Sequence, residues 1–454
     1  MYFSIFSGDE KKIIFTTNDT PIYRHSFTAD YWVYDIVTRV MKPLSTNGAQ
    51  EVATFSPDGT KVAFVRGNNL FWVDLASGKE TQITTDGKFN FILNGKPDWV
   101  YEEEYGFAQA YQWAPDSQSI AYWKTDESRV KEYHMNFFQK QLYPTVYSFK
   151  YPKAGEQNSI VSIHTVNLAT GVTKEMNIGE ETDIYVPRIK WTNDSRNVLV
   201  FRLNRLQNNF DMLQCNAVTG ENSIVYNQKD KRYINRLEDQ TVMFLSDGDR
   251  YIIQSEKDGY NHLYLYSLSK GFIRQITKGG WEVTELLGVD GNTVYYMSAE
   301  TSPVIRNLYS INLKGSNKKR ITKGEGNYTI NFNNDFSYFI SYFTNATTPN
   351  TVTLHTADGK QVRVLENNTE LKAKIQEYKL PVKEFFSFTT AEGVSLNGYM
   401  MRPSNFDLKK KYPVFMTQYS GPGSQQVLDR WTMEWEHCLV QDGYILVCVD
   451  GRGT

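Results

Sequence analysis

Three successive glutamates form the most unusual local sequence of this 454-residue chain. Residues 98–105 read Asp-Trp-Val-Tyr-Glu-Glu-Glu-Tyr, so three carboxylates that repel one another are flanked by aromatic rings. Two carboxylates that converge can clamp an ammonium group through charge-assisted hydrogen bonds and so hold a peptide by its free α-amine. A solvated acidic turn is the alternative, because most charge runs lie at the surface. Spacing does not decide between the two, since neighbouring helical positions point about 100° apart.

Tyr419 is a second candidate, in the sequence Gln-Tyr-Ser-Gly-Pro-Gly at residues 418–423. It follows an apolar run typical of a buried strand, where an α/β sheet opens its ligand site. A tyrosine hydroxyl in this place can donate to a developing oxyanion and supplement a backbone N–H. The alternative is an ordinary aromatic residue that closes a Gly-Pro turn. Ser420 and Ser424 are rejected as nucleophiles because neither lies in a Gly-x-Ser-x-Gly elbow.

Histidine and cysteine offer little further chemistry. His437 is the one histidine beyond residue 370, so no Ser-His-Asp order can be assembled there, and we interpret it as a partly buried helix residue. Cys215, Cys438 and Cys448 lie far from any metal-ligand spacing, and we predict free thiols without catalytic work. We therefore expect neither a metal site nor a cofactor.

Charge and hydropathy narrow the classes of partner. Lys and Arg number 49 against 51 Asp and Glu, so there is no basic field to recruit nucleic acid or an acidic membrane surface. No segment approaches the roughly 20 apolar residues that span a bilayer. Residues 1–8 have no charged region before an apolar core, as a signal peptide would. We expect no nucleic-acid partner and no membrane segment in this chain.

A repeated β unit must position these candidates. Aromatic residues reach 14% of the chain, which favours sheet. Up to about residue 365 the same pattern recurs: an aromatic or apolar residue, a polar turn built on Asp with Gly or Ser, and an alternating strand. The copies are marked by Asp58, Asp116, Asp194, Asp247, Asp290 and Asp335.

The spacing of these markers predicts a β-propeller. Three intervals of 43 to 53 residues suit four-stranded blades, and the intervals of 58 and 78 residues must hold insertions. The first insertion contains residues 98–106 and the second contains residues 147–155. Both are candidates for function, because loops vary freely while the blades maintain the fold.

After about residue 370 the pattern changes. We predict a short helix over 371–378 and strands over 383–389 and 395–402. The apolar runs 413–419 and 444–450 are typical of strands buried on both faces, with a crossover helix within 424–442. The predicted domains are a propeller, 1–370, and the start of a truncated α/β-hydrolase domain, 371–454.

Five segments in order resemble dipeptidyl peptidase IV and its bacterial relatives, within the prolyl oligopeptidase class of serine peptidases. They are residues 98–104, 151–155, 258–263, 412–425 and the Asp-Gly-Arg-Gly of 450–453. The resemblance covers essentially the whole chain. It implies an eight-bladed propeller, with an incomplete first blade here, that caps an α/β-hydrolase domain and encloses peptides between the two.

The resemblance also implies roles for single residues. Glu103 and Glu104 match the pair that binds the substrate's N-terminal amine, and Tyr419 matches the oxyanion tyrosine. Arg24 matches the arginine that binds the carbonyl of the first substrate residue; without the resemblance it would be interpreted as a surface residue. Residues 151–172 correspond to the arm through which family members form dimers, with an extended hairpin of unknown use as the alternative.

The implied activity is that of an exopeptidase that releases N-terminal X-Pro or X-Ala dipeptides through an acyl-enzyme. Implied partners are peptides with a free N-terminus and a second copy of the chain, in the periplasm or cell envelope. Family members carry the serine in a Gly-Trp-Ser-Tyr-Gly-Gly elbow beyond Asp-Gly-Arg-Gly, followed by the Asp and the His. None of these lies in this sequence, so we expect the chain by itself to lack the triad and hydrolyse nothing. The first propeller strands and any signal are also expected to be missing.

Two functions of other classes stay open. One is a non-catalytic peptide-binding propeller or an inactive relative. The other is a purely structural propeller, in which Glu103 and Glu104 could become alanine without consequence for any bound peptide.

Overall fold

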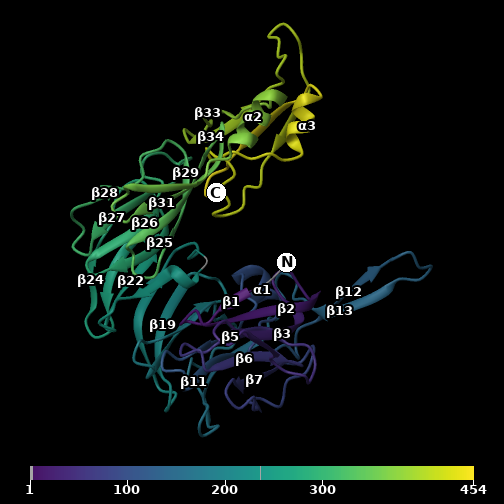
Figure 1. Cartoon of the computed structure of the whole chain (residues 1–454), viewed down its shortest axis with the longest axis vertical. Coiled ribbons are helices and arrows are strands. Elements are labelled where there is room, and N and C mark those ends of the chain that lie inside the picture. Colours follow the sequence, from purple (N-terminus) through teal and green to yellow (C-terminus); the bar gives the residue numbers. More distant parts are fainter. Residues whose placement is uncertain (1–3, 236) are drawn as a thin grey trace. The chain divides into compact units, whose positions relative to one another are not determined.

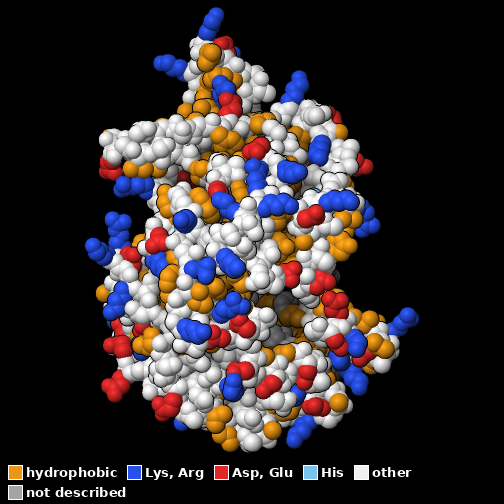
Figure 2. Space-filling model, turned by 90° about the vertical axis from the view of Figure 1, so that its left-hand side faces the viewer, with side chains coloured by type: hydrophobic (Ala, Val, Ile, Leu, Met, Phe, Trp, Pro, Cys, Tyr) orange, Lys and Arg blue, Asp and Glu red, His pale blue; other side chains and the backbone are white. Residues whose placement is uncertain are grey.

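The computed structural model describes residues 4–235 and 237–454, and strands dominate it (Figure 1). The chain divides into two compact units. The first comprises the described residues up to Asp239 with Phe244–Tyr251 and Ser267–Gly271, and the second comprises the remainder. On the face drawn in Figure 2, basic and acidic side chains are interspersed, as expected from the balanced charge.

Four antiparallel sheets follow one another in the first unit, each a meander of neighbouring strands. The first contains β1 (Ser4–Phe6), β2 (Lys12–Pro21), β3 (Phe27–Asp35) and β4 (Val40–Pro43). The second contains β5 (Glu51–Phe55), β6 (Lys61–Arg66), β7 (Asn69–Asp74) and β8 (Glu80–Gln82). The third contains β9 (Ile92–Asn94), β10 (Tyr111–Trp113), β11 (Ser119–Asp126), β14 (Ile160–Asn167) and β15 (Thr173–Glu175). The fourth contains β16 (Ile184–Tyr185), β17 (Ile189–Trp191), β18 (Asn197–Asn204), β19 (Asn209–Asn216) and β20 (Asn222–Lys229).

Three more sheets of the same kind follow, and the division between the units runs through the fifth. After the 3₁₀ turn η1 (Asp239–Thr241), the fifth sheet contains β21 (Val242–Phe244), β22 (Arg250–Ser255), β23 (His262–Ser267) and β24 (Gly271–Gln275). The sixth contains β25 (Val283–Asp290), β26 (Thr293–Ser298), β27 (Asn307–Asn312) and β28 (Lys319–Arg320). The seventh contains β29 (Asn327–Phe332), β30 (Tyr338–Asn345), β31 (Thr348–Thr356) and β32 (Gln361–Glu366).

Five of the six marker aspartates lie in a turn between two paired strands: β5 and β6, β10 and β11, β17 and β18, β21 and β22, or β29 and β30. Asp290 is the last residue of β25 and pairs with Thr293 of β26, so its hairpin turn begins just after it. In two of the five turns the carboxylate accepts from the hydroxyl two residues earlier, Ser56 at 2.6 Å and Thr192 at 2.7 Å. This turn also joins successive sheets, because Asp58 N donates to Ser117 Oγ at 3.0 Å. The repeat predicted from the aspartates is confirmed.

The first sheet contains a further copy of this turn that the marker pattern missed. Ser7 Oγ donates to Asp9 Oδ1 at 2.7 Å and accepts from Lys12 N at 2.9 Å, as Ser56 does with Asp58 and Lys61. The copy escaped notice because Gly precedes Asp here instead of following it.

Successive sheets pack face to face. Ile14 and Tyr31 of the first sheet share a core with Phe64 of the second. Val65, the next residue, points to the opposite face and packs with Ile120 of the third sheet. This alternation along one strand lets each sheet cover both neighbours, and it is the packing of propeller blades.

The fold is therefore mainly β, with propeller-type blades. The described residues contain seven such sheets, and the count of eight blades stays a prediction. We expected an incomplete first blade; the first sheet has four strands, of which β1 is three residues long.

The last sheet starts an α/β arrangement. After α2 (Thr369–Tyr378), strands β33 (Glu384–Thr389), β34 (Ser395–Met401), β35 (Val414–Thr417) and β36 (Ile445–Val449) pair in the order β33-β34-β36-β35. The predicted helix and strands are confirmed within a few residues. The β35 and β36 pair is parallel, and α3 (Glu436–Gln441) lies in the connection between them. The domain boundary after residue 370 stays a prediction.

One expectation for this sheet is wrong. We expected β35 to be buried on both faces, but Val414 is 61% and Met416 is 56% exposed. The reason is its position at the sheet edge, where β36 is its one paired neighbour among the described residues. Strand β36 is more buried, with Leu446 at 1% exposure.

Candidate functional site

Helix α1 (Trp99–Tyr105) carries the three glutamates and lies in the insertion between β9 and β10. Asp98 caps its N-terminus, because Asp98 Oδ1 accepts from Tyr101 N at 3.0 Å. Gly106 ends the helix with φ 71°, a left-handed conformation that glycine adopts without strain. The sequence therefore specifies both ends of this seven-residue helix.

Contacts with the surrounding blades hold the helix in place. Tyr101 Oη accepts from Val186 N at 2.9 Å. Arg188 Nη2 donates to Tyr105 O at 2.8 Å, at the C-terminal end of the helix. Both tyrosines are buried. Hydrogen bonds thus hold α1 at its middle and at its end, and they fix the positions from which its glutamate side chains extend.

Two buried carboxyl groups interact through their charges: Asp98, at the start of this helix, and Glu127. Asp98 Oδ2 accepts from Ser159 Oγ at 2.5 Å, and burial raises the pKa of Asp98. Burial, together with the charge of Asp98, raises the pKa of Glu127 to about 7. Glu127 is thus a carboxyl group that changes charge near neutral pH.

The three glutamates of α1 have three environments. Glu102 is 2% exposed, and its Oε1 accepts from the backbone N–H groups of His25 and Ser26, each at 2.8 Å. The Glu103 side chain is 28% exposed, and Glu104 is exposed. The triplet is therefore not a uniformly solvated acidic turn.

Arg24 reaches the helix from the turn between β2 and β3. Its Nε donates to Glu103 Oε2 at 2.9 Å, and its Nη2 lies 2.8 Å from Glu103 Oε1. This two-point geometry is the strong form of an arginine-carboxylate pair. The Arg24 side chain nevertheless stays 67% exposed, so it can still meet a ligand. With Glu104, the three groups carry one net negative charge, which suits an ammonium group.

Aromatic side chains adjoin this turn. The ring of Tyr23 lies 5.9 Å from that of Phe149 in β13, and burial, followed by the neighbouring Tyr147, raises the pKa of Tyr23. Residues on the second insertion therefore contact the residue that precedes Arg24.

The second insertion forms a hairpin of β12 (Glu132–Phe137) and β13 (Thr145–Lys150), which projects from its unit (Figure 1). We placed the projecting arm at residues 151–172, and that position is wrong. Those residues contain β14, which pairs with β11 inside the third sheet. The error arose because the arm was placed by the resemblance and not by the strand pattern. In β12, Tyr133, Met135 and Phe137 alternate with polar residues, but every residue of the strand is exposed, so the alternation marks no buried face.

Tyr419 belongs to the second unit and lies just beyond β35. Its side chain is 74% exposed. The turn after it is narrow, because a Cβ at Gly421 would lie 2.7 Å from Cε1 of the Tyr419 ring. The C-terminal residues support this turn: Gly423 N donates to Gly453 O at 2.9 Å, and Asp450 Oδ1 accepts from Gln426 N at 2.8 Å.

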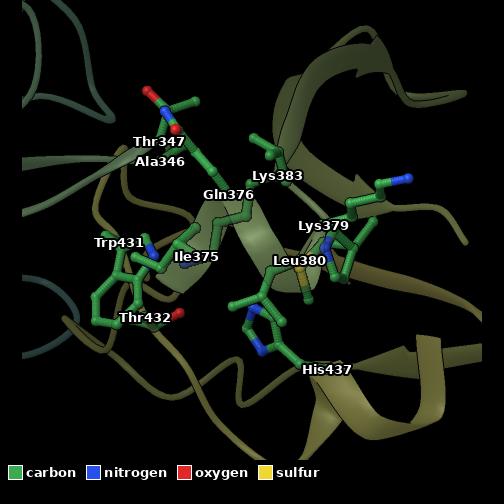
Figure 3. A pocket seen from close by; sticks show the side chains of 13 residues that line it. Ala346, Thr347, Ile375, Gln376, Lys379, Leu380, Lys383, Trp431, Thr432 and His437 are labelled. Carbon is green, nitrogen blue, oxygen red and sulfur yellow. The ribbon is translucent and has the colours of Figure 1, made fainter. Parts of the chain in front are cut away.

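Two cavities occur near this segment. One, of about 260 Å³, is lined by Tyr419 with Thr417, Lys383 and Tyr399 among others. The other, of about 290 Å³, lies beside α2 and is lined largely by apolar side chains such as Ile375, Leu380 and Trp431, with His437 at its base (Figure 3). His437 is a buried residue of α3, as expected for a helix histidine, and burial lowers its pKa.

The structure thus joins Arg24 and Glu103 directly, places Glu104 beside Glu103 on one helix, and presents Tyr419 at an exposed turn. Sequence reasoning missed Glu102. A signal was available, because Tyr101 and Tyr105 are spaced as one buried helix face and Glu102 lies three residues before Tyr105.

The cysteines, possible metal ligands and helix lengths can be compared with the predictions from the sequence. The three cysteines are free thiols, as predicted. Among residues 4–235 and 237–454, no three His, Cys, Asp or Glu side chains cluster in a way that could hold a metal ion. Within the same ranges, no helix has the length and apolar character needed to cross a membrane.

The known proteins that are similar to this chain are dipeptidyl peptidases by name. Residues 7–350 match the family described as the dipeptidyl peptidase IV (DPP IV) N-terminal region. "Probable dipeptidyl-aminopeptidase B" of Podospora anserina is 32% identical over 485 residues, covering 99% of this chain and 52% of the relative. "Dipeptidyl peptidase 4" of Trichophyton rubrum is 30% identical over 472 residues, covering 99% and 60%.

A solved structure is similar as well. The crystal structure of Porphyromonas gingivalis dipeptidyl peptidase 4 superimposes with a TM-score of 0.95 at 41% identity, covering 99% of this chain and 64% of that one. The chain thus spans between about half and under two thirds of the length of these relatives.

Proposed function

The chain belongs to the dipeptidyl peptidase IV family, and on that premise we propose that its gene product is a serine exopeptidase that removes N-terminal dipeptides. The observation that carries the proposal is the two-point ion pair of Arg24 with Glu103, beside Glu104 on the same fixed helix. Its substrates are peptides with a free N-terminus and with proline, or less well alanine, as the second residue.

Each residue has a role in this proposal. Glu103 and Glu104 accept hydrogen bonds from the substrate ammonium, which fixes where the peptide begins. The exposed Arg24 guanidinium donates to the carbonyl oxygen of the first substrate residue. The scissile bond then follows the second residue, so the product is a dipeptide.

The chemical step needs a nucleophile and an oxyanion donor. A serine hydroxyl attacks the carbonyl carbon of the second residue, its proton passes to a histidine, and the peptide amine leaves with a proton to give an acyl-enzyme that water hydrolyses. Tyr419 donates its phenolic hydroxyl to the developing oxyanion. The serine, the histidine and its aspartate are those of the Gly-Trp-Ser-Tyr-Gly-Gly elbow and the segments after it in the family.

The first test compares two substrates in the complete gene product. A Gly-Pro chromogenic amide with a free amine should be cleaved, whereas the same amide with an acetylated amine should react roughly 10²-fold more slowly, because each hydrogen bond of the charged amine to a carboxylate is worth about 1.5–3 kcal/mol. The measurement is kcat/KM for each. Equal cleavage of both substrates would show that Glu103 and Glu104 do not bind the substrate's amine.

We also propose that the gene product forms a homodimer through the β12 and β13 hairpin. The tip of the hairpin is apolar, with Leu142 88%, Tyr143 79% and Phe138 68% exposed, and such a patch suits a protein interface. The double variant Leu142→Ser with Tyr143→Ser should sediment as a monomer. The control variant Leu206→Ser, at an exposed leucine of another loop, should remain a dimer. Dimers that persist in the double variant would place the interface elsewhere.

A further inference from the structure

Glu102 is the buried member of the glutamate triplet and binds backbone instead of solvent. Its Oε1 accepts from His25 N and Ser26 N, both at 2.8 Å. Burial of a carboxylate is costly unless hydrogen bonds compensate, and two N–H donors on one oxygen provide that compensation. The contact joins residues 76 and 77 positions apart in the sequence, so it is a tertiary restraint and not a local cap.

The segment that Glu102 holds is the turn that carries Arg24. Ile22 N donates to Ser26 O at 2.9 Å and Tyr23 N lies 3.3 Å from Ser26 Oγ, so the turn is closed on itself. Arg24 lies at its tip. Glu102 attaches the second half of this turn to α1, and Glu103, one residue later, binds the Arg24 guanidinium.

Two consecutive carboxylates of one helix thus hold the backbone and the side chain of the same short turn. The helix is itself fixed by its Asp98 cap and by the bonds of Tyr101 to Val186 N and of Arg188 to Tyr105 O. Movement of the turn relative to α1 therefore requires loss of the Glu102 bonds. Those bonds set the position of the Arg24 guanidinium relative to Glu103 and Glu104.

We propose that Glu102 is a positioning residue for substrate recognition: it fixes Arg24 at the distance from the amine-binding glutamates that the first residue of a peptide requires. This inference rests on the proposed function. Glu102 itself does not touch the substrate, since it is 2% exposed and its Oε1 is occupied by the turn. Its removal should therefore weaken binding through Arg24 and leave the chemical step unchanged.

The test measures kcat and KM on a free-amine Gly-Pro chromogenic amide with the complete gene product. Glu102→Ala should raise KM roughly tenfold with kcat nearly unchanged, because a displaced Arg24 loses its hydrogen bond to the substrate, and a hydrogen bond of a charged group is worth about that factor. Glu102→Gln keeps a side-chain oxygen that can accept both N–H bonds and should stay within about threefold of the wild type. A Gln variant as impaired as the Ala variant would contradict the proposal.

A double-mutant cycle with Arg24→Ala separates positioning from general stability. If Glu102 acts through Arg24, Glu102→Ala should change KM less than about twofold in the Arg24→Ala background. The matched control is Asp211→Ala, which removes another buried carboxylate, paired with Arg202 at 2.7 Å in the fourth sheet. It should lower the melting temperature without raising KM.

Two further results would overturn the inference: additive effects of Glu102→Ala and Arg24→Ala, or a KM increase in Asp211→Ala equal to that in Glu102→Ala. Failure of the proposed function is a distinct result, since wild-type protein would then cleave the free and the acetylated substrates equally.

Discussion

Three adjacent glutamates have three different environments because a helix points them in different directions. Glu102 lies beside the buried face of α1 and binds backbone, whereas Glu103 pairs with Arg24 and Glu104 is exposed. Neighbouring positions on a helix differ by about 100°, so adjacency in the chain does not imply a shared environment. The acidic run that looked like a surface feature is partly structural.

The proposed oxyanion role of Tyr419 can be tested by a single substitution. Tyr419→Phe in the complete gene product should lower kcat by about 10²-fold or more while KM for the Gly-Pro amide changes little, because the hydroxyl acts on the oxyanion and not on the bound substrate. Tyr378→Phe, at the exposed end of α2, is the control and should be silent. A Tyr419→Phe enzyme with wild-type kcat would exclude the oxyanion role.

At the scale of elements, α1 is a short helix whose stability depends on buried polar contacts. A seven-residue helix is marginal by itself, so its cap at Asp98 and its contacts with the blades decide whether it forms. The hairpin of β12 and β13 belongs to the same neighbourhood through the Tyr23 and Phe149 rings. The two insertions also contact each other directly, because the ring of Trp99 lies 4.4 Å from that of Tyr151.

Glu127 supplies a pH prediction for this region. Burial and the charge of Asp98 raise its pKa from 4.5 to about 7 in the folded protein, against the opposing charges of Lys150 and Lys96. A carboxyl group with a raised folded-state pKa stabilises the fold below pH 4.5, and this contribution is lost as pH rises through 7. The unfolding free energy should therefore fall between about pH 5 and 8, by roughly 1–3 kcal/mol from this group.

Glu127→Gln should remove that pH dependence. The stability of the variant relative to the wild type should grow as pH rises, because glutamine carries no charge to bury. Denaturant unfolding of the complete gene product at pH 5 and pH 8 measures the difference. Glu175→Gln, on an exposed strand, should show no such trend. A constant difference between Glu127→Gln and wild type at both values would disprove the titration of Glu127.

At the scale of the whole molecule, the repeats could be predicted because their signal is local. Asp with Gly or Ser specifies each turn, and strand alternation specifies one buried face. Six copies of this pattern along the chain were therefore enough to predict propeller blades. The turn at Ser7 and Asp9 was missed because its Gly and Asp are interchanged. The arm was misplaced because its position came from the resemblance alone. Strand β12 does alternate polar and apolar residues, but all of them are exposed, so this alternation specifies no buried face.

The site was less predictable because it depends on contacts distant in sequence. Arg24 and Glu103 are 79 residues apart, and nothing in either segment alone indicates the other. The local sequence indicated the glutamate run and Tyr419 as candidates, and the resemblance to the family supplied Arg24 and the choice of Glu103 and Glu104. The buried role of Glu102 became visible only in three dimensions. The exposure of β35 depends likewise on which strands surround it and not on its apolar sequence.

The central claim is that the glutamates of α1 bind a substrate's free amine. The most direct measurement is the ratio of kcat/KM for a free-amine Gly-Pro amide to that for its acetylated form, in wild type, Glu104→Gln and the exposed control Glu221→Gln. The account predicts that Glu104→Gln lowers this ratio by roughly tenfold, since one of the two carboxylates that bind the charged amine is lost, and that Glu221→Gln leaves it unchanged. An undiminished ratio in Glu104→Gln would contradict the claim.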